Sequence, residues 1–126
     1  MTSAFSSFAL DAVNTRRLAE FWTRALNYRI AEEEDGIISL ASADGYGPPI
    51  DILPVPEAKS VKNRLHLDLH AVGCTQAEEV ERLLALGAVR ADVGQGTEVS
   101  WVVLADPEGN EFCVLASSPD SGAAGS

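Results

Sequence analysis

Positively charged residues and cysteines are scarce in this sequence of 126 residues, and each shortage excludes a class of protein. Nine Lys and Arg stand against 19 Asp and Glu, a formal net charge of −10, which argues against binding to nucleic acid or to an anionic membrane surface. Two cysteines are too few for a small disulfide-held fold, so we expect Cys74 and Cys113 to be reduced thiols in the cytoplasm. No apolar run approaches the roughly 20 residues of a membrane helix, and residues 1–7 do not resemble a signal peptide.

Histidine is also rare, and both histidines lie in the segment 65–70, which reads LHLDLH. Apolar and polar residues alternate there, as in a strand with one covered face. We expect the apolar side chains to pack under helices: Leu65, Leu67 and Leu69. The opposite face carries the polar side chains: His66, Asp68 and His70. This face either meets water or lines a ligand site.

The remaining patterns predict the order strand, helix, three strands, and then the same order again. The first unit has strands at 5–13, 28–34, 37–42 and 50–53, with a helix at 15–26. The second has strands at 65–71, 88–93, 99–104 and 111–116, with a helix that starts at a Thr75–Glu78 capping box and ends at Gly87. Helices that follow one strand of each unit can cover only one face of a sheet. The face with His66 is therefore left open or curved around a cavity, which favours a ligand site.

The segment 101–112, WVVLADPEGNEF, combines a strand, an Asp-Pro-x-Gly-Asn turn and a final strand. It resembles a motif of the glyoxalase / bleomycin-resistance / dioxygenase superfamily, also called the vicinal oxygen chelate superfamily. Shorter matches support the resemblance: LAEFW at 18–22, NRLHLD at 63–68 and LGA at 86–88. The resemblance covers residues 4–116 and is greatest to a small actinobacterial glyoxalase-like branch.

The resemblance implies an α+β fold in which two paired βαβββ modules form a curved, mostly antiparallel, cup-like sheet with helices on its outer face. The expected single domain spans residues 1–117, with module 1 at about 4–54, a connector at 55–63 and module 2 at about 64–116. Residues 118–126 are small and polar, so we expect a disordered tail. Many relatives are homodimers, and we expect a homodimer here.

Metal-using members of the superfamily place four ligands in the cup, and carrying these positions over gives Ser7, Asp51, His66 and Cys113. Serine is a poor metal ligand, and Cys113 stands where those members have Glu, with Glu111 two residues earlier on the same strand face. We therefore expect no cofactor and no stoichiometric transition metal. A zinc site that uses the aspartate, histidine and cysteine of this set, with one open position, is a weaker alternative.

Four residues are candidates for contact with a ligand: Asp51, Trp101, Tyr46 and Cys113. The parity of Asp51 in the apolar run 50–53 directs its side chain away from those of its neighbours. Trp101 either stacks on a planar ligand or packs in the core. Tyr46 lies in the loop 44–49, near which a crevice between two subunits is expected. Cys113 either lines the site or is an inert buried thiol.

These observations and the resemblance lead to three functional hypotheses. The first is a small-molecule-binding protein that sequesters an apolar metabolite or antibiotic, as the resemblance to bleomycin-resistance proteins implies. The second is a metal-independent isomerase, epimerase or lyase in which His66 or His70, with Asp68, transfers protons. Spacing does not choose between the histidines, because each lies two residues from Asp68. The third and weakest hypothesis is a zinc-dependent lyase.

Overall fold

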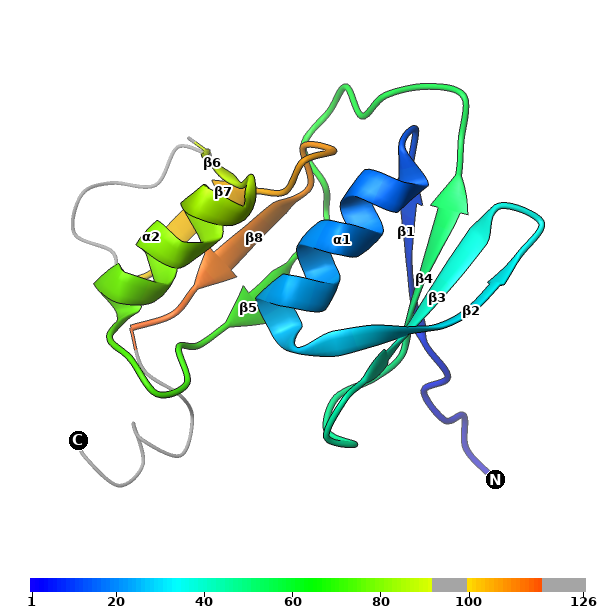
Figure 1. The fold of residues 1–126 in the computed structure, drawn as a ribbon, viewed down its shortest axis with the longest axis horizontal. Helices are drawn as coiled ribbons and strands as arrows, with labels where there is room; N and C mark the ends of the chain where they lie inside the picture. The colour runs from blue at the N-terminus through cyan, green and yellow to red at the C-terminus, as the bar shows by residue number, and fades with distance from the viewer. Residues whose placement is uncertain (92–99, 117–126) are drawn as a thin grey trace. The chain divides into compact units, whose positions relative to one another are not determined.

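The chain runs through one strand, one helix and three strands, and then repeats that order (Figure 1). The structure is a computed structural model that describes residues 1–91 and 100–116. It divides into two compact units, Met1–Ala58 (unit 1) and Lys59–Ser126 (unit 2). These findings confirm the predicted α+β fold of two βαβββ modules, while the boundaries of one common domain stay a prediction.

Unit 1 forms a four-stranded sheet with one helix. Its elements are β1 (Phe8–Ala12), α1 (Thr15–Leu26), β2 (Tyr28–Glu34), β3 (Ile37–Ser42) and β4 (Ile50–Pro54). The strand order is β1-β4-β3-β2, with β1 parallel to β4 and the other neighbours antiparallel. Asp35 and Gly36 link β2 to β3 with φ angles of 54° and 83°, the backbone conformation of the predicted tight hairpin.

The helix α1 begins and ends where its capping residues predict. The side chain of Asn14 accepts a hydrogen bond from the backbone N–H of Arg17, and Asn27 closes the helix in the left-handed conformation. One stripe of the helix is buried: Leu18, Ala19, Phe21, Trp22 and Ala25. It packs on the sheet, whose own buried residues are Ala12, Ile38, Leu40, Ile50 and Ile52. Burial of these apolar side chains therefore fixes which face of the sheet stays uncovered.

Unit 2 repeats this topology. Its elements are β5 (Leu67–Leu69), α2 (Gln76–Leu86), β6 (Val89–Arg90), β7 (Val102–Ala105) and β8 (Glu111–Val114). The strand order is β5-β8-β7-β6, with β5 parallel to β8. The predicted capping box is present, because Thr75 and Glu78 each accept a hydrogen bond from the other's backbone N–H. Val80 and Leu83 of α2 are buried, as are Phe112 and Val114 of β8.

The prediction for the strand 65–71 was wrong at its ends. Pairing with β8 begins at Leu67, opposite Phe112, so Leu65 precedes the sheet and is 86% exposed instead of lying under a helix. Leu67 and Leu69 are only half-buried. The other strands are found within a few residues of their predicted positions, although the segment 92–99 and the tail from 117 onward lie outside the described residues.

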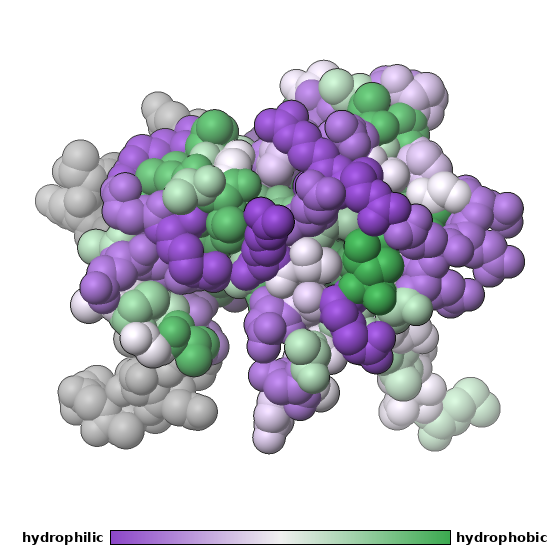
Figure 2. Space-filling model, viewed as in Figure 1, coloured by the Kyte–Doolittle hydropathy of each residue, from purple (hydrophilic) through white to green (hydrophobic). Residues whose placement is uncertain are grey.

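Both cysteines are free, as predicted, with Cys74 exposed and Cys113 buried. Hydrophilic side chains make up much of the outer surface of both helices (Figure 2). Neither of the helices found in residues 1–91 and 100–116 has the length and apolar content needed to cross a bilayer.

Candidate functional site

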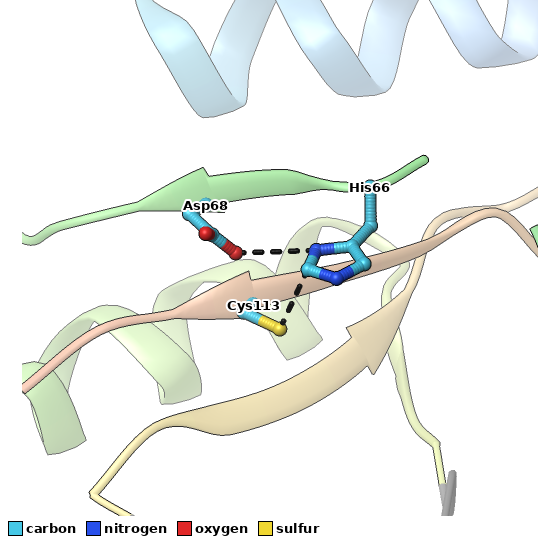
Figure 3. A group of neighbouring side chains, drawn as sticks. All are labelled: His66, Asp68 and Cys113. Atoms are coloured by element: carbon cyan, nitrogen blue, oxygen red, sulfur yellow. Dashed lines mark hydrogen bonds and ion pairs between the residues drawn. The ribbon is translucent and has the colours of Figure 1, made fainter. Parts of the chain in front are cut away.

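Three polar side chains converge beside the parallel pair β5 and β8 (Figure 3). Asp68 in β5 lies opposite Cys113 in β8, and His66 precedes Asp68 by two residues. Nδ1 of His66 is 3.2 Å from Oδ1 of Asp68 and 3.9 Å from Sγ of Cys113. The structure thus brings three of the predicted site residues together, and we call them the His66–Asp68–Cys113 cluster.

Strand alternation explains why Asp68 and Cys113 share a face. Asp68 is flanked by two leucines that lie opposite Phe112 and Val114. Phe112 and Val114 are 1% and 0% exposed, so the hydrophobic effect holds their face of β8 against the core. A register shift by one residue would bury Asp68, which makes this pairing strongly specified.

Exposure and charge differ across the cluster. The side chains of His66 and Asp68 are 39% and 51% exposed, whereas Cys113 is 6% exposed. Burial raises the pKa of the Cys113 thiol, as do the negative charge of Asp68 and the hydrogen bond to it, and the charge of Lys62 only partly opposes them. Cys113 is therefore protonated at neutral pH and is an S–H donor rather than a ready nucleophile.

The contacts of His66 separate two kinds of chemistry. In a nucleophilic triad the acid contacts one ring nitrogen of the histidine and the nucleophile contacts the other. Here Asp68 and Cys113 both approach Nδ1, so the cluster is not a thiol triad. The arrangement suits either a histidine oriented by Asp68 that presents Nε2 as an acid or base, or three ligands that converge on one cation.

Unit 1 offers a direct counterpart of this cluster. Ala9 in β1 lies opposite Asp51 in β4, as Asp68 lies opposite Cys113. Ser7 precedes Ala9 by two residues and donates a hydrogen bond from Oγ to Oδ2 of Asp51 at 3.1 Å. Ala9 thus matches Asp68 of unit 2, Asp51 matches Cys113, and Ser7 matches His66. Ser7 therefore holds in unit 1 the position that His66 holds in unit 2.

Asp51 points as its parity predicted, because Ile50 and Ile52 are buried at 2% and 0% exposure. It lines a shallow, open cleft of about 240 Å³ on unit 1. The other lining residues are Glu32, Glu34, Asp35, Ile37 and Ser39. Four of these six residues are acidic, so the cleft would repel an anion.

The four positions implied by the resemblance do not fit a metal in this chain. Ser7 is a neutral hydroxyl that already donates to Asp51. Glu111, the nearby alternative to Cys113, accepts hydrogen bonds from Nζ of Lys59 at 2.8 Å and from the backbone N–H of Asn63 at 3.0 Å, so both its oxygens are engaged. The His66–Asp68–Cys113 cluster fits better, because its ligand atoms lie within 4.8 Å of one another. The sequence suggested Asp68 only as an acid–base partner of a histidine. The alternation of apolar and polar residues from 65 to 70 was the signal that places Asp68 on the same face as His66.

The other predicted site residues lie outside this cluster. Trp101 immediately precedes β7 and is 40% exposed, so it is not a core residue. Tyr46 is 79% exposed in a loop of unit 1. His70 is exposed just after β5, and no hydrogen bond or ion pair joins it to another residue in the described part of the chain. The structure therefore pairs Asp68 with His66 rather than with His70.

Comparison with known families gives a match over residues 7–115 to the model described as a glyoxalase-like domain. The chain belongs to this family. The glyoxalase-like domain is part of the vicinal oxygen chelate superfamily, so the superfamily suggested by the sequence is confirmed.

Solved structures share the fold of this glyoxalase-like protein at low identity. The fosfomycin resistance protein FosX of Listeria monocytogenes, in a mutant form complexed with Mn(II) and 1S,2S-dihydroxypropylphosphonic acid, is 16% identical, with a TM-score of 0.70 over 95% of this chain and 94% of that chain. FosX of Mesorhizobium loti is 12% identical, with a TM-score of 0.70 over 98% and 99%. A glyoxalase/bleomycin resistance protein/dioxygenase family enzyme of Burkholderia phytofirmans is 17% identical, with a TM-score of 0.67 over 89% and 97%. No curated protein matches the sequence.

Proposed function

We propose that this glyoxalase-like protein binds a small organic molecule on the face of unit 2 that carries the His66–Asp68–Cys113 cluster. The observation that carries the proposal is the orientation of His66. Asp68 holds Nδ1 at 3.2 Å, whereas Nε2 has no hydrogen-bond partner among residues 1–91 and 100–116. An oriented imidazole with one free nitrogen is a specific polar contact of the kind that small-molecule sites use.

Charge limits the class of ligand. The formal net charge is −10, and Asp68 places a carboxylate group within the cluster itself. A phosphonate such as the one bound by FosX of Listeria would meet repulsion at these groups. The proposed ligand is therefore neutral or cationic, and it includes an apolar ring that could stack on the half-exposed Trp101. The role is sequestration of a metabolite or antibiotic.

A specific observation favours a second candidate function. Oδ1 of Asp68 lies 3.2 Å from Nδ1 of His66, close enough for the carboxylate to orient the imidazole and leave Nε2 to exchange a proton with a ligand. The second candidate is therefore a metal-independent isomerase, epimerase or lyase with His66 as general base and Asp68 as the residue that positions it. His70 has no such contact in the described residues and is dropped from this role.

Fluorescence titration tests the proposed function. Metal-free bleomycin, a cationic molecule with aromatic rings, and fosfomycin, a small phosphonate, are added separately to the full chain in the presence of EDTA. We expect saturable quenching of tryptophan emission with bleomycin, lost in Trp101→Leu because only buried Trp22 remains. Saturable binding of fosfomycin with none of bleomycin would contradict the charge argument.

A matched pair of variants separates binder from enzyme. His66→Ala and His70→Ala remove the only two histidines one at a time. In the binder, His66→Ala weakens binding by about tenfold, the effect of one lost hydrogen bond to a charged or polarised group, and His70→Ala does not. Chemical conversion of the ligand, detected by mass spectrometry and abolished by His66→Ala without loss of binding, would instead establish the second candidate.

Three finer expectations accompany this proposal. We propose that the protein is a cytoplasmic homodimer of the actinobacterial glyoxalase-like branch. Light scattering coupled to size-exclusion chromatography measures the dimer directly, and a mass of 13.3 kDa in solution would show a monomer.

A further inference from the structure

We propose that the His66–Asp68–Cys113 cluster binds one zinc-class divalent cation through a single unit of the chain, with Asp68 as the third ligand. The site differs from the four positions implied by the family resemblance, because it uses neither Ser7 nor Asp51. It lies on the same face of unit 2 as the ligand site proposed above. Its test uses metal ions alone, without an organic ligand, so either proposal can fail without the other.

Distances within the cluster suit a tetrahedral ion. Bonds of about 2.0–2.1 Å to nitrogen and oxygen and about 2.3 Å to sulfur place a nitrogen and an oxygen ligand about 3.4 Å apart, and a nitrogen and a sulfur ligand about 3.6 Å apart. The observed separations are 3.2 Å from His66 Nδ1 to Asp68 Oδ1 and 3.9 Å from Nδ1 to Cys113 Sγ. Small side-chain rotations would bring all three atoms to bonding distance.

Convergence of the side chains on one point supports a cation rather than a relay of protons. Oδ1 of Asp68 and Sγ of Cys113 both approach Nδ1 of His66, and the ligand atoms of the three residues lie within 4.8 Å of one another (Figure 3). Two ligands are partly exposed and the third is buried, so one side of the site opens to solvent. Three protein ligands and one open position make the coordination of a catalytic or ligand-accepting zinc site.

The ligand types narrow the choice of metal. A thiolate disfavours Mg²⁺ and Ca²⁺, which prefer oxygen, while imidazole, thiolate and carboxylate together suit Zn²⁺. Binding releases the thiol proton of Cys113 and displaces any proton on Nδ1 of His66. An occupied site would therefore use Nδ1 for the metal, and the acid–base role of His66 belongs to the metal-free protein.

Position in the fold explains why unit 2 carries the site alone. At the matching positions of unit 1, Ala9 stands in place of Asp68 and Ser7 in place of His66. Unit 1 thus lacks both the imidazole and the third ligand. Asp68 is not among the four positions implied by the family resemblance, which are Ser7, Asp51, His66 and Cys113.

Metal titration of the full chain, stripped with a chelator, tests the proposal. We expect Co²⁺ and Zn²⁺ each to bind at one ion per chain by calorimetry, and Co²⁺ to give a thiolate-to-metal charge-transfer band. His66→Ala and Asp68→Asn should each weaken Zn²⁺ binding by at least about 100-fold. Loss of a residue that only hydrogen-bonds to a metal ligand, without binding the metal itself, weakens binding by about 10–100-fold. His70→Ala and Asp51→Asn, the matched controls, should leave the affinity within about twofold.

The charge-transfer band identifies the sulfur ligand without disturbing the sheet. Cys74 is exposed, so Cys74→Ser should fold normally and keep the band, which then arises from Cys113. Cys113→Ser should lose the band, with circular dichroism as the check that it folds. Loss of the band in Cys74→Ser, absence of one-to-one binding in the wild type, or an equal loss of affinity in Asp51→Asn would each overturn the proposal.

Discussion

Units 1 and 2 have the same strand order and the same parallel pairing of first and last strand, yet they differ in the chemistry on that pair. In unit 1 the pair carries Ser7, Ala9 and Asp51, and in unit 2 it carries His66, Asp68 and Cys113. The first set makes one hydrogen bond, from serine to aspartate. The second brings an imidazole, a carboxylate and a thiol into mutual contact. One backbone arrangement thus provides the positions, and two side chains decide whether those positions form a cluster.

The largest expected change comes from giving unit 1 the side chains of unit 2. Ser7→His together with Ala9→Asp would place an imidazole and a carboxylate beside the retained Asp51, in the register of the unit 2 cluster. Ala9 is exposed, so the added carboxylate needs no burial. We expect the Co²⁺ stoichiometry to rise from one to two ions per chain in calorimetry. Each single substitution is the control, and a double variant that stays at one ion would show that the two units do not present these positions alike.

The hydrophobic cores provide the second comparison. Trp22 on α1 is 1% exposed within a stripe of five buried apolar residues, whereas α2 buries Val80 and Leu83. Trp22→Ala should lower the free energy of unfolding by about 3–5 kcal/mol. Leu65→Ala, at a residue that is 86% exposed, should change it by less than about 0.5 kcal/mol in the same urea titration. A smaller loss for Trp22→Ala than for Leu83→Ala would indicate that unit 2 has the more important core.

A third difference lies at Glu111, whose counterpart in unit 1 is Pro49. Burial acts to raise the pKa of Glu111, but hydrogen bonds from Lys59 and Asn63 outweigh it and hold the pKa below its ordinary value of 4.5. A lowered pKa means that the ionised group stabilises the fold above the ordinary value, and that this stabilisation is lost as the pH falls through the folded value. Glu111→Gln should therefore cost about 1–2 kcal/mol at pH 7.

The same substitution should cost progressively less in acid. Unfolding of wild type and Glu111→Gln in urea at several pH values between neutral and strongly acidic measures this convergence. A cost that stays constant with pH would show that the hydrogen bonds of Glu111, and not its charge, hold the segment 59–63 to β8.

Local signals in the sequence predicted much of the fold. The apolar stripe and the flanking asparagines placed α1, and the capping box placed the start of α2. The start of β5 was less predictable, because LHLDLH alternates from Leu65 onward although its partner strand is reached only at Leu67. Pairing with a strand more than 40 residues away sets that boundary, and the local pattern does not contain it.

The candidate site was predictable in its members but not in its assembly. His66, Asp68 and Cys113 were each suggested by the sequence, yet the symmetric spacing of His66 and His70 about Asp68 left the pairing open. The contact between His66 and Asp68 depends on the tertiary structure, and so does the strand register that sets Cys113 opposite Asp68.

Nuclear magnetic resonance of the two histidine rings tests the central claim, that the functional face is the one with the His66–Asp68–Cys113 cluster. Metal-free bleomycin is titrated into the chain in EDTA, and His66→Ala assigns the two sets of ring signals. We predict that the ring signals of His66 shift saturably with bleomycin while those of His70 remain in place. A shift of the His70 signals alone, or saturable binding that moves neither ring, would contradict the account and place the binding site elsewhere.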